Sequence, residues 1–168
     1  MNFPLSALLR RSAPLWACAV LAACASLRSP ASLPPGTTIA EVRQSFGAGD
    51  EYALPGGGTR VAFRRGRDTY MLDFDPSGRL VHSDQVLTLP SFATIQPGMS
   101  KTDVLTRLGQ PAFVFPIGYQ QLQVWNYRFG GLEGDCMVFQ ISFSNATGAV
   151  TEAGQGPDPT CSRDSAHD

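Results

Sequence analysis

The C-terminal third of the chain contains two cysteines, Cys136 and Cys161, which could bind a metal, act as nucleophiles or join as a disulfide. Neither has a second cysteine or a histidine at metal-ligand spacing, which argues against a zinc site. In an oxidising compartment an even pair predicts a disulfide, which here closes a loop of 26 residues. The alternative is two free thiols, one of them buried.

One triplet, His82-Ser83-Asp84, contains the three residue types of a hydrolase triad. On a strand His82 and Asp84 face one way and Ser83 the other, so the three cannot form a nucleophile, base and orienting acid in series. The only other histidine, His167, lies close to the chain end. The sequence therefore predicts a protein that is not an enzyme, with no cofactor, no metal and no small-molecule substrate.

A third cysteine, Cys24, follows Leu21-Ala22-Ala23 at the end of an uncharged apolar run that begins after Arg10 and Arg11. The run is too short to cross a bilayer and has the length and flanks of a signal peptide. Leu-Ala-Ala-Cys resembles the lipobox of bacterial lipoproteins. The resemblance implies a signal peptide over residues 1–23 and lipidation of Cys24. The alternative is an ordinary signal peptide, cut at an Ala-x-Ala site, with Cys24 incidental.

Charge and length agree with export of a small protein. The 168 residues carry a formal net charge of −1, and removal of residues 1–23 leaves 145 residues with a net charge near −3. Such a balance excludes a typical nucleic-acid-binding protein, which has a strong basic excess. The residue after Cys24 is Ala25 rather than Asp, which in lipoproteins implies the outer membrane, here its periplasmic face.

Two matching segments, residues 36–47 and 98–109, form an internal repeat with an offset of 62. Each begins with glycine, then has a hydroxyl followed three residues later by an acid: Thr38 with Glu41, and Ser100 with Asp103. This is the capping-box pattern of a helix start, and a glycine ends each segment where a helix stops. The repeat therefore predicts two short amphipathic helices. Residues 24–35 and 153–168 are expected to be a tether and a mobile tail.

Alternating apolar residues after each helix predict antiparallel strands. In the first unit a Gly66-Arg67 turn pairs Phe63 with Tyr70, Val61 with Leu72 and Arg60 with Asp73. We therefore expect an α+β fold of two tandem units, residues 36–89 and 90–152. Each unit would pack a short helix on a three-stranded antiparallel meander.

The second unit resembles the SmpA/OmlA, or BamE-like, family of small outer-membrane lipoproteins. The matching residues are Gly98-Met99-Ser100, Asp103-Val104, Leu108-Gly109-x-Pro111, Trp125-x-Tyr127 and Gly148-x-Val150. The first unit fits the helix motif but lacks the later proline and aromatic pair. The resemblance implies a non-enzymatic accessory or scaffold protein, with a role in β-barrel assembly or envelope integrity and barrel-assembly proteins as partners.

Two tandem units of this kind also resemble the architecture of secreted β-lactamase inhibitory proteins. That resemblance implies an alternative function, a periplasmic enzyme-binding or inhibitor module whose sheet faces hold the partner.

The loop over residues 113–119 is the candidate partner-binding surface, through Phe115, Ile117 and Tyr119. Exposed apolar residues mark protein or membrane contacts, but the same side chains could fill the junction between the units. An arginine group, Arg60, Arg64, Arg65 and Arg67, could meet lipid phosphates or an acidic partner. The alternative is cross-strand pairing with Asp68 and Asp73.

Overall fold

The computed structural model describes residues 29–132 and 134–161. It contains two four-stranded antiparallel sheets with strand orders β1-β2-β3-β4 and β5-β6-β7-β8. The first sheet consists of β1 (Asp50–Ala53), β2 (Thr59–Arg65), β3 (Asp68–Phe74) and β4 (Leu80–Gln85). The second consists of β5 (Phe113–Ile117), β6 (Leu122–Gly130), β7 (Cys136–Ser144) and β8 (Val150–Pro157).

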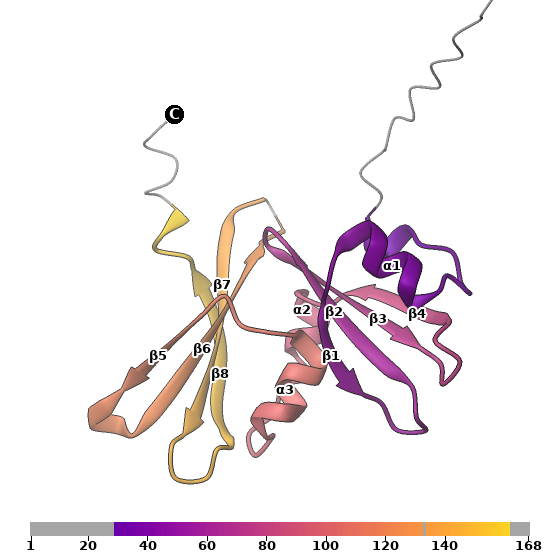
Figure 1. Ribbon diagram of the computed structural model, residues 1–168. Helices are drawn as coiled ribbons and strands as arrows, with labels where there is room; N and C mark the ends of the chain where they lie inside the picture. The colour runs from indigo at the N-terminus through magenta and orange to yellow at the C-terminus, as the bar shows by residue number, and fades with distance from the viewer. Residues whose placement is uncertain (1–28, 133, 162–168) are drawn as a thin grey trace, which may run out of the picture.

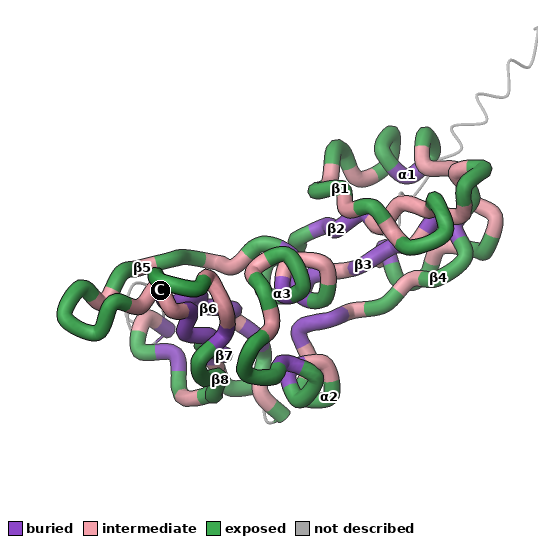
Figure 2. The backbone as a smooth tube through the Cα atoms, turned by 90° about the horizontal axis from the view of Figure 1, so that it is seen from below, coloured by how far each residue is buried: buried purple, intermediate pink, exposed green. Residues whose placement is uncertain are grey.

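Short helices complete the fold. They are η1 (Pro30–Ser32), α1 (Ile39–Phe46), α2 (Leu89–Phe92), α3 (Lys101–Leu108) and η2 (Gly118–Gln120). Helices α2 and α3 lie between the two sheets, and α1 lies on the far side of the first sheet (Figures 1 and 2). The order of layers is therefore α1, first sheet, α3 with α2, second sheet.

The expected α+β fold of helices on three-stranded meanders is wrong, because the described chain is mostly β and each sheet has four strands. Both missed strands, β1 and β5, are edge strands that precede the three predicted ones. Strand β1 is short and polar, with Asp50 and Glu51 exposed. Strand β5 contains Pro116, which is tolerated at an edge because one side of the strand needs no ladder hydrogen bonds.

The ends of the described chain are also more ordered than expected. Within the predicted tether, Pro30–Ser32 forms η1, and the Ser83 hydroxyl of β4 donates to the Pro30 carbonyl at 3.0 Å. The predicted tail overlaps β8, which extends to Pro157. The causes differ: burial of Pro30 and the hydrogen bond from Ser83 hold η1 against the first sheet, whereas backbone pairing with β7 orders the end of β8.

Both predicted helices and their caps are confirmed. Thr38 and Glu41 form a capping box at the start of α1, and Ser100 and Asp103 form the same box at α3. The segment before each helix also pairs with the last strand of its own unit. Gly36 donates to the Leu80 carbonyl and Gly98 to the Val150 carbonyl, each at 2.8 Å. The sequence repeat is therefore a structural repeat.

Two apolar clusters fill the layers. One lies between α1 and the first sheet and contains Val42, Val61, Phe63, Leu72, Phe74 and Leu80. The larger one surrounds α3 and joins the two sheets, because it contains Ala62 and Met71 of the first sheet with Tyr127, Ile141 and Phe143 of the second. The two repeats thus share a core.

At the junction the chain after α3 comes very close to the first sheet. Gly109 has φ +75°, and a Cβ there would lie 3.0 Å from Cγ2 of Thr69 and 3.5 Å from the Cβ of Ala62. The buried Tyr127 hydroxyl donates to the Gly109 carbonyl at 3.0 Å, and burial raises the pKa of Tyr127. The positive φ favours glycine here, and a Cβ would make a tight contact that the Thr69 side chain would have to move to relieve.

Candidate partner-binding face

The second sheet has one face packed on α2 and α3 and one face that no helix among the described residues covers (Figure 1). The strand registers place side chains from all four strands on this second face. We call it the open face and define it by Phe113, Phe115, Ile117, Leu122, Val124, Asn126, Val138, Gln140, Ser142, Glu152, Gly154 and Gly156.

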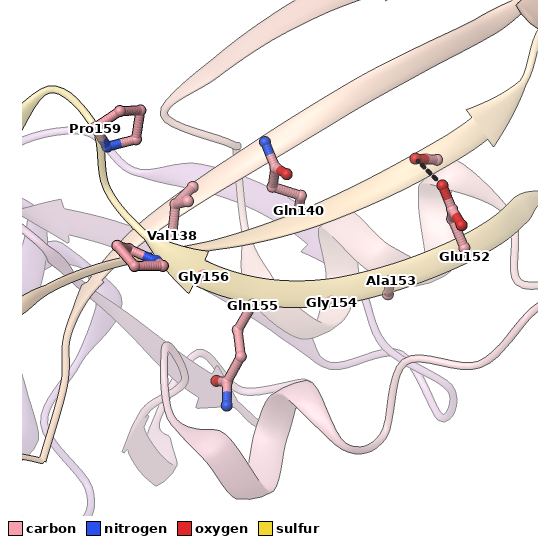
Figure 3. Close-up of a pocket in the computed structure, with 10 residues that line it drawn as sticks. Val138, Gln140, Glu152, Ala153, Gly154, Gln155, Gly156 and Pro159 are labelled. Carbon is pink, nitrogen blue, oxygen red and sulfur yellow. Dashed lines mark hydrogen bonds between the residues drawn. The ribbon is translucent and has the colours of Figure 1, made fainter.

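The open face is divided into an apolar side and a polar side. On β5, Phe113 is 43% exposed, and Phe115 and Ile117 are half-buried. On β7 and β8, a groove of about 450 Å³ is lined by Gln140, Ser142, Glu152 and the two glycines of β8. Figure 3 shows Val138, Gln140 and Glu152 on one side of these strands and Gln155 on the other. Because Gly154 and Gly156 have no side chains, the groove is open along β8.

Asn126 lies between the two halves and is fully buried. Its Oδ1 accepts a hydrogen bond from Nε2 of Gln140, on the neighbouring strand, at 2.7 Å. Its Nδ2 has no acceptor among the described residues. A buried donor without a partner is energetically unfavourable. A bound molecule that offered an acceptor to Nδ2, after a side-chain movement, would therefore add a hydrogen bond that the free protein lacks.

One end of the open face is closed by the segment that follows β8. Asp158 is buried, forms an ion pair with Arg128 and accepts a hydrogen bond from the Thr160 hydroxyl at 2.7 Å. Burial acts to raise the pKa of Asp158, but the hydrogen bonds from Thr160 and Arg128 outweigh it and lower the pKa. The predicted disulfide joins Cys161 to Cys136, with Cα atoms 6.0 Å apart.

The three predicted partner-binding residues occupy different positions. Phe115 and Ile117 belong to β5, opposite Val124 and Leu122, and Tyr119 lies in η2 with 87% of its surface exposed. The sheet junction is filled by other residues, so these three do not serve there. Their binding role stays a prediction. Sequence reasoning missed Phe113, although Phe113, Phe115 and Ile117 alternate with the period of a strand.

The arginine group is largely used inside the fold. Arg60 pairs with Asp73 as predicted, and Arg64 donates to the Gln110 carbonyl beyond α3. Arg65 lies opposite Asp68 in the strand register, as predicted. Its guanidinium, however, lies 4.8 Å from the ring centre of Phe46. Arg67 donates to Sγ of Cys161 at 2.8 Å. These contacts favour a structural role for the group.

The triplet of β4 is arranged as its alternation predicts. His82 lies opposite Asp73 and Asp84 opposite Met71, whereas Ser83 lies opposite Leu72 on the other face. Among the described residues no group of three or more histidine, cysteine or acidic side chains could hold a metal ion. The absence of enzymatic activity stays a prediction.

The predicted signal peptide and Cys24 lie outside the described residues. No helix in residues 29–132 and 134–161 has the length and apolarity needed to cross a membrane. Lipidation and localisation therefore stay predictions from the sequence.

The solved structures that match this chain include the following two. One is a proposed β-lactamase inhibitor protein from Streptococcus mutans, with a TM-score of 0.30, 11% identity, and 76% of this chain and 87% of that chain covered. The other is a cysteine-rich secretory protein from Staphylococcus aureus, with a TM-score of 0.28, 12% identity, and 71% and 43% covered. Overlaps this low carry no functional argument.

No family model and no curated protein matches the chain. The expected membership of the SmpA/OmlA family therefore has no support beyond the motif residues. The resemblance to β-lactamase inhibitory proteins rests on the tandem arrangement of the two units, and the match at a TM-score of 0.30 adds no argument to it.

Proposed function

We propose that this chain is an exported, non-enzymatic binding module that holds a folded partner, of the class of a periplasmic or secreted enzyme, on its open face. The observation that carries the proposal is the row of partly exposed apolar side chains on β5, beside a polar groove on a face without a covering helix. Protein interfaces also place aromatic and apolar side chains next to polar groups.

The form of the face supports a folded partner over a small ligand. The groove is open along β8, whereas small-molecule sites enclose most of their ligand. The strands beneath the face pack on the shared core around α3, so the face is formed before a partner binds. A preformed surface lowers the entropy cost of association.

The sequence around Cys24 favours a second candidate function. In it the chain is a lipid-anchored accessory or scaffold protein on the periplasmic face of the outer membrane, in contact with β-barrel assembly proteins. Both candidates use the open face, but they differ in the partner.

The test is a crosslinking pull-down from detergent-solubilised membranes with the full chain and with a Phe115→Ser, Ile117→Ser, Tyr119→Ser variant. The control is Val81→Ser, which changes a side chain on β4 that is 59% exposed and far from the open face in the fold. We expect the triple variant to lose partner capture with a nearly unchanged unfolding temperature, and the control to keep capture.

Two other outcomes are informative. Full capture by a folded triple variant would remove this surface from the function. A loss of roughly 2–5 kcal/mol of stability per substitution would show that the side chains serve the core instead. The captured protein separates the candidates: a periplasmic enzyme supports the first and a barrel-assembly protein the second.

A further inference from the structure

The outer strands of the two sheets differ in how well their free edges are protected against pairing with a further strand. Strand β1 has four residues, two of them acidic, and β5 has five residues including Pro116. The start of β4 is hydrogen bonded to Gly36 and Thr37, and η1 packs against this strand. Short length, charge, proline and covering segments are the usual ways to prevent strand pairing at an edge.

Strand β8 has eight residues and lacks these protections over most of its length. The segment before α3 pairs only with its first residue, Val150. Residues 151–155 are exposed, with Glu152 the only charged side chain, and the strand reaches no proline before Pro157. An edge of this kind is a template for another strand.

The hydrogen-bond pattern shows which backbone groups of β8 are free. Asp158 donates to the Cys136 carbonyl at 2.9 Å, which makes these opposite residues a hydrogen-bonded pair. In an antiparallel ladder such pairs alternate, so Gly156, opposite Val138, and Gly154, opposite Gln140, also bond to β7. The N–H and C=O groups of Ala153 and Gln155 consequently point away from β7.

We propose that β8 pairs antiparallel with β8 of a second copy of this chain, centred on Gly154, so that the two second sheets join into one. In this register Ala153 of each copy exchanges both hydrogen bonds with Gln155 of the other, which satisfies all the outward groups of both residues. The pairing goes beyond the proposed function and does not depend on it.

The side chains of β8 suit a copy of themselves. Glu152 falls opposite Gly156 of the second copy, so no like charges oppose each other across the new ladder. Gly154 falls opposite Gly154, and a Cβ at either glycine of β8 would meet nothing within 4 Å. A two-fold axis perpendicular to the sheet keeps the two open faces on the same side, and the two grooves then lie next to each other.

The first experiment introduces Gly154→Cys into the full chain, expressed in the periplasm and analysed on non-reducing gels. At a non-hydrogen-bonded pair the Cα atoms are about 4.5 Å apart, within reach of a disulfide. We expect a several-fold excess of a two-chain species that disappears on reduction. The matched control is Gly118→Cys after β5, where a Cβ also meets nothing within 4 Å.

The second experiment leaves the surface otherwise intact. Ala153→Pro removes an outward N–H group and spares the ladder to β7. The unmodified chain, purified in non-ionic detergent, should sediment as two chains and the Ala153→Pro variant as one. The variant should also abolish crosslinking through Gly154→Cys.

Three results would overturn the proposal. One is a single-chain species for the unmodified protein at all concentrations. Another is equal crosslinking of Gly154→Cys and Gly118→Cys. The third is crosslinking of Gly154→Cys to a different protein, which would assign the edge of β8 to a foreign strand.

Discussion

Arg60 and Asp73 lie opposite each other on β2 and β3 and form a two-pronged ion pair, with Nε–Oδ1 and Nη2–Oδ2 distances of 2.6 and 2.7 Å. The remaining Nη1 of Arg60 donates to the Thr106 carbonyl in the last turn of α3 at 2.9 Å. The hydrogen bonds to Asp73 raise the pKa of Arg60, although burial opposes them. One side chain therefore joins the first sheet to the helix of the second repeat.

We predict that Arg60→Ala lowers the free energy of unfolding by about 2–3 kcal/mol, because it leaves the carboxylate of Asp73 and the carbonyl of Thr106 without their charged donor. The measurement is urea unfolding followed by tryptophan fluorescence. The matched control is Arg43→Ala, whose ion pair with Glu51 is exposed on both sides and should contribute less than about 1 kcal/mol. Equal losses in the two variants would contradict a linking role for Arg60.

The sequence predicted the parts of the fold that local chemistry determines. Capping boxes at Thr38 and Ser100 locate helix starts because the hydroxyl and the acid are three residues apart. The turn at Gly66 fixes the register of β2 and β3, and the structure has all three predicted pairs. These signals act over a few residues, so no knowledge of the rest of the chain is needed.

The missed elements are stabilised by distant parts of the chain. Residues 153–155 of β8 lie beyond the predicted end of the second unit at residue 152. They are exposed on both faces, so their sequence has no apolar alternation and only pairing with β7 makes them a strand. Helix α2 has four residues, too few for a periodic signal. At the site, the burial of Asn126 and its bond to Gln140 depend on the register of β6 and β7. The contact of Arg60 with Thr106 spans 46 residues and has no local signature.

A second prediction concerns the disulfide between Cys136 and Cys161. Paired Cys→Ser replacement should lower the free energy of unfolding by about 3 kcal/mol, because the open chain gains loop entropy in the unfolded state. It should also release the segment from Asp158 to Cys161 from the end of the open face. Urea unfolding measures the first effect and hydrogen exchange at Thr160 the second.

The control for the disulfide is Arg67→Ala, which removes the contact to Cys161 and keeps the covalent bond. This variant should keep the hydrogen-exchange rate of the Thr160 amide within a few-fold of the rate in the unmodified protein. Two thiols that react with a maleimide in the denatured, unreduced chain would show that the bond does not form.

A third prediction is acid sensitivity arising at the two helix starts. The backbone and hydroxyl hydrogen bonds from Thr38 lower the pKa of Glu41, and those from Ser100 lower the pKa of Asp103. A carboxyl with a lowered pKa in the folded state stabilises the protein above its ordinary pKa. That contribution is lost as the pH falls through the lowered value. Stability should therefore decrease as the pH falls from about 5 toward 3.

The measurement for this third prediction is the unfolding temperature as a function of pH. A Glu41→Gln, Asp103→Asn variant should have a shallower decrease over the same range. Thr38→Ala with Ser100→Ala should also flatten the curve, because both carboxyls lose the hydroxyl partners that shift their pKa. Unchanged curves in both variants would assign the acid sensitivity to other carboxyls, such as Asp75 and Asp158, whose pKa values are also lowered.

The last prediction concerns Cys24, which follows Leu21-Ala22-Ala23 in the sequence. If the resemblance to a lipobox is correct, the mature N-terminus is an acylated Cys24, and several acyl chains hold the protein at the membrane, each buried methylene adding about 0.8 kcal/mol. Cys24→Ser should then give a soluble chain or an uncleaved precursor, with Cys18→Ser as the control that keeps membrane binding. Mass spectrometry of the mature N-terminus tests this directly, and an unmodified terminus at another residue would refute it.

Because Ala25 follows the cysteine, the lipidated form should fractionate with the outer membrane, and recovery in the inner membrane would contradict that localisation.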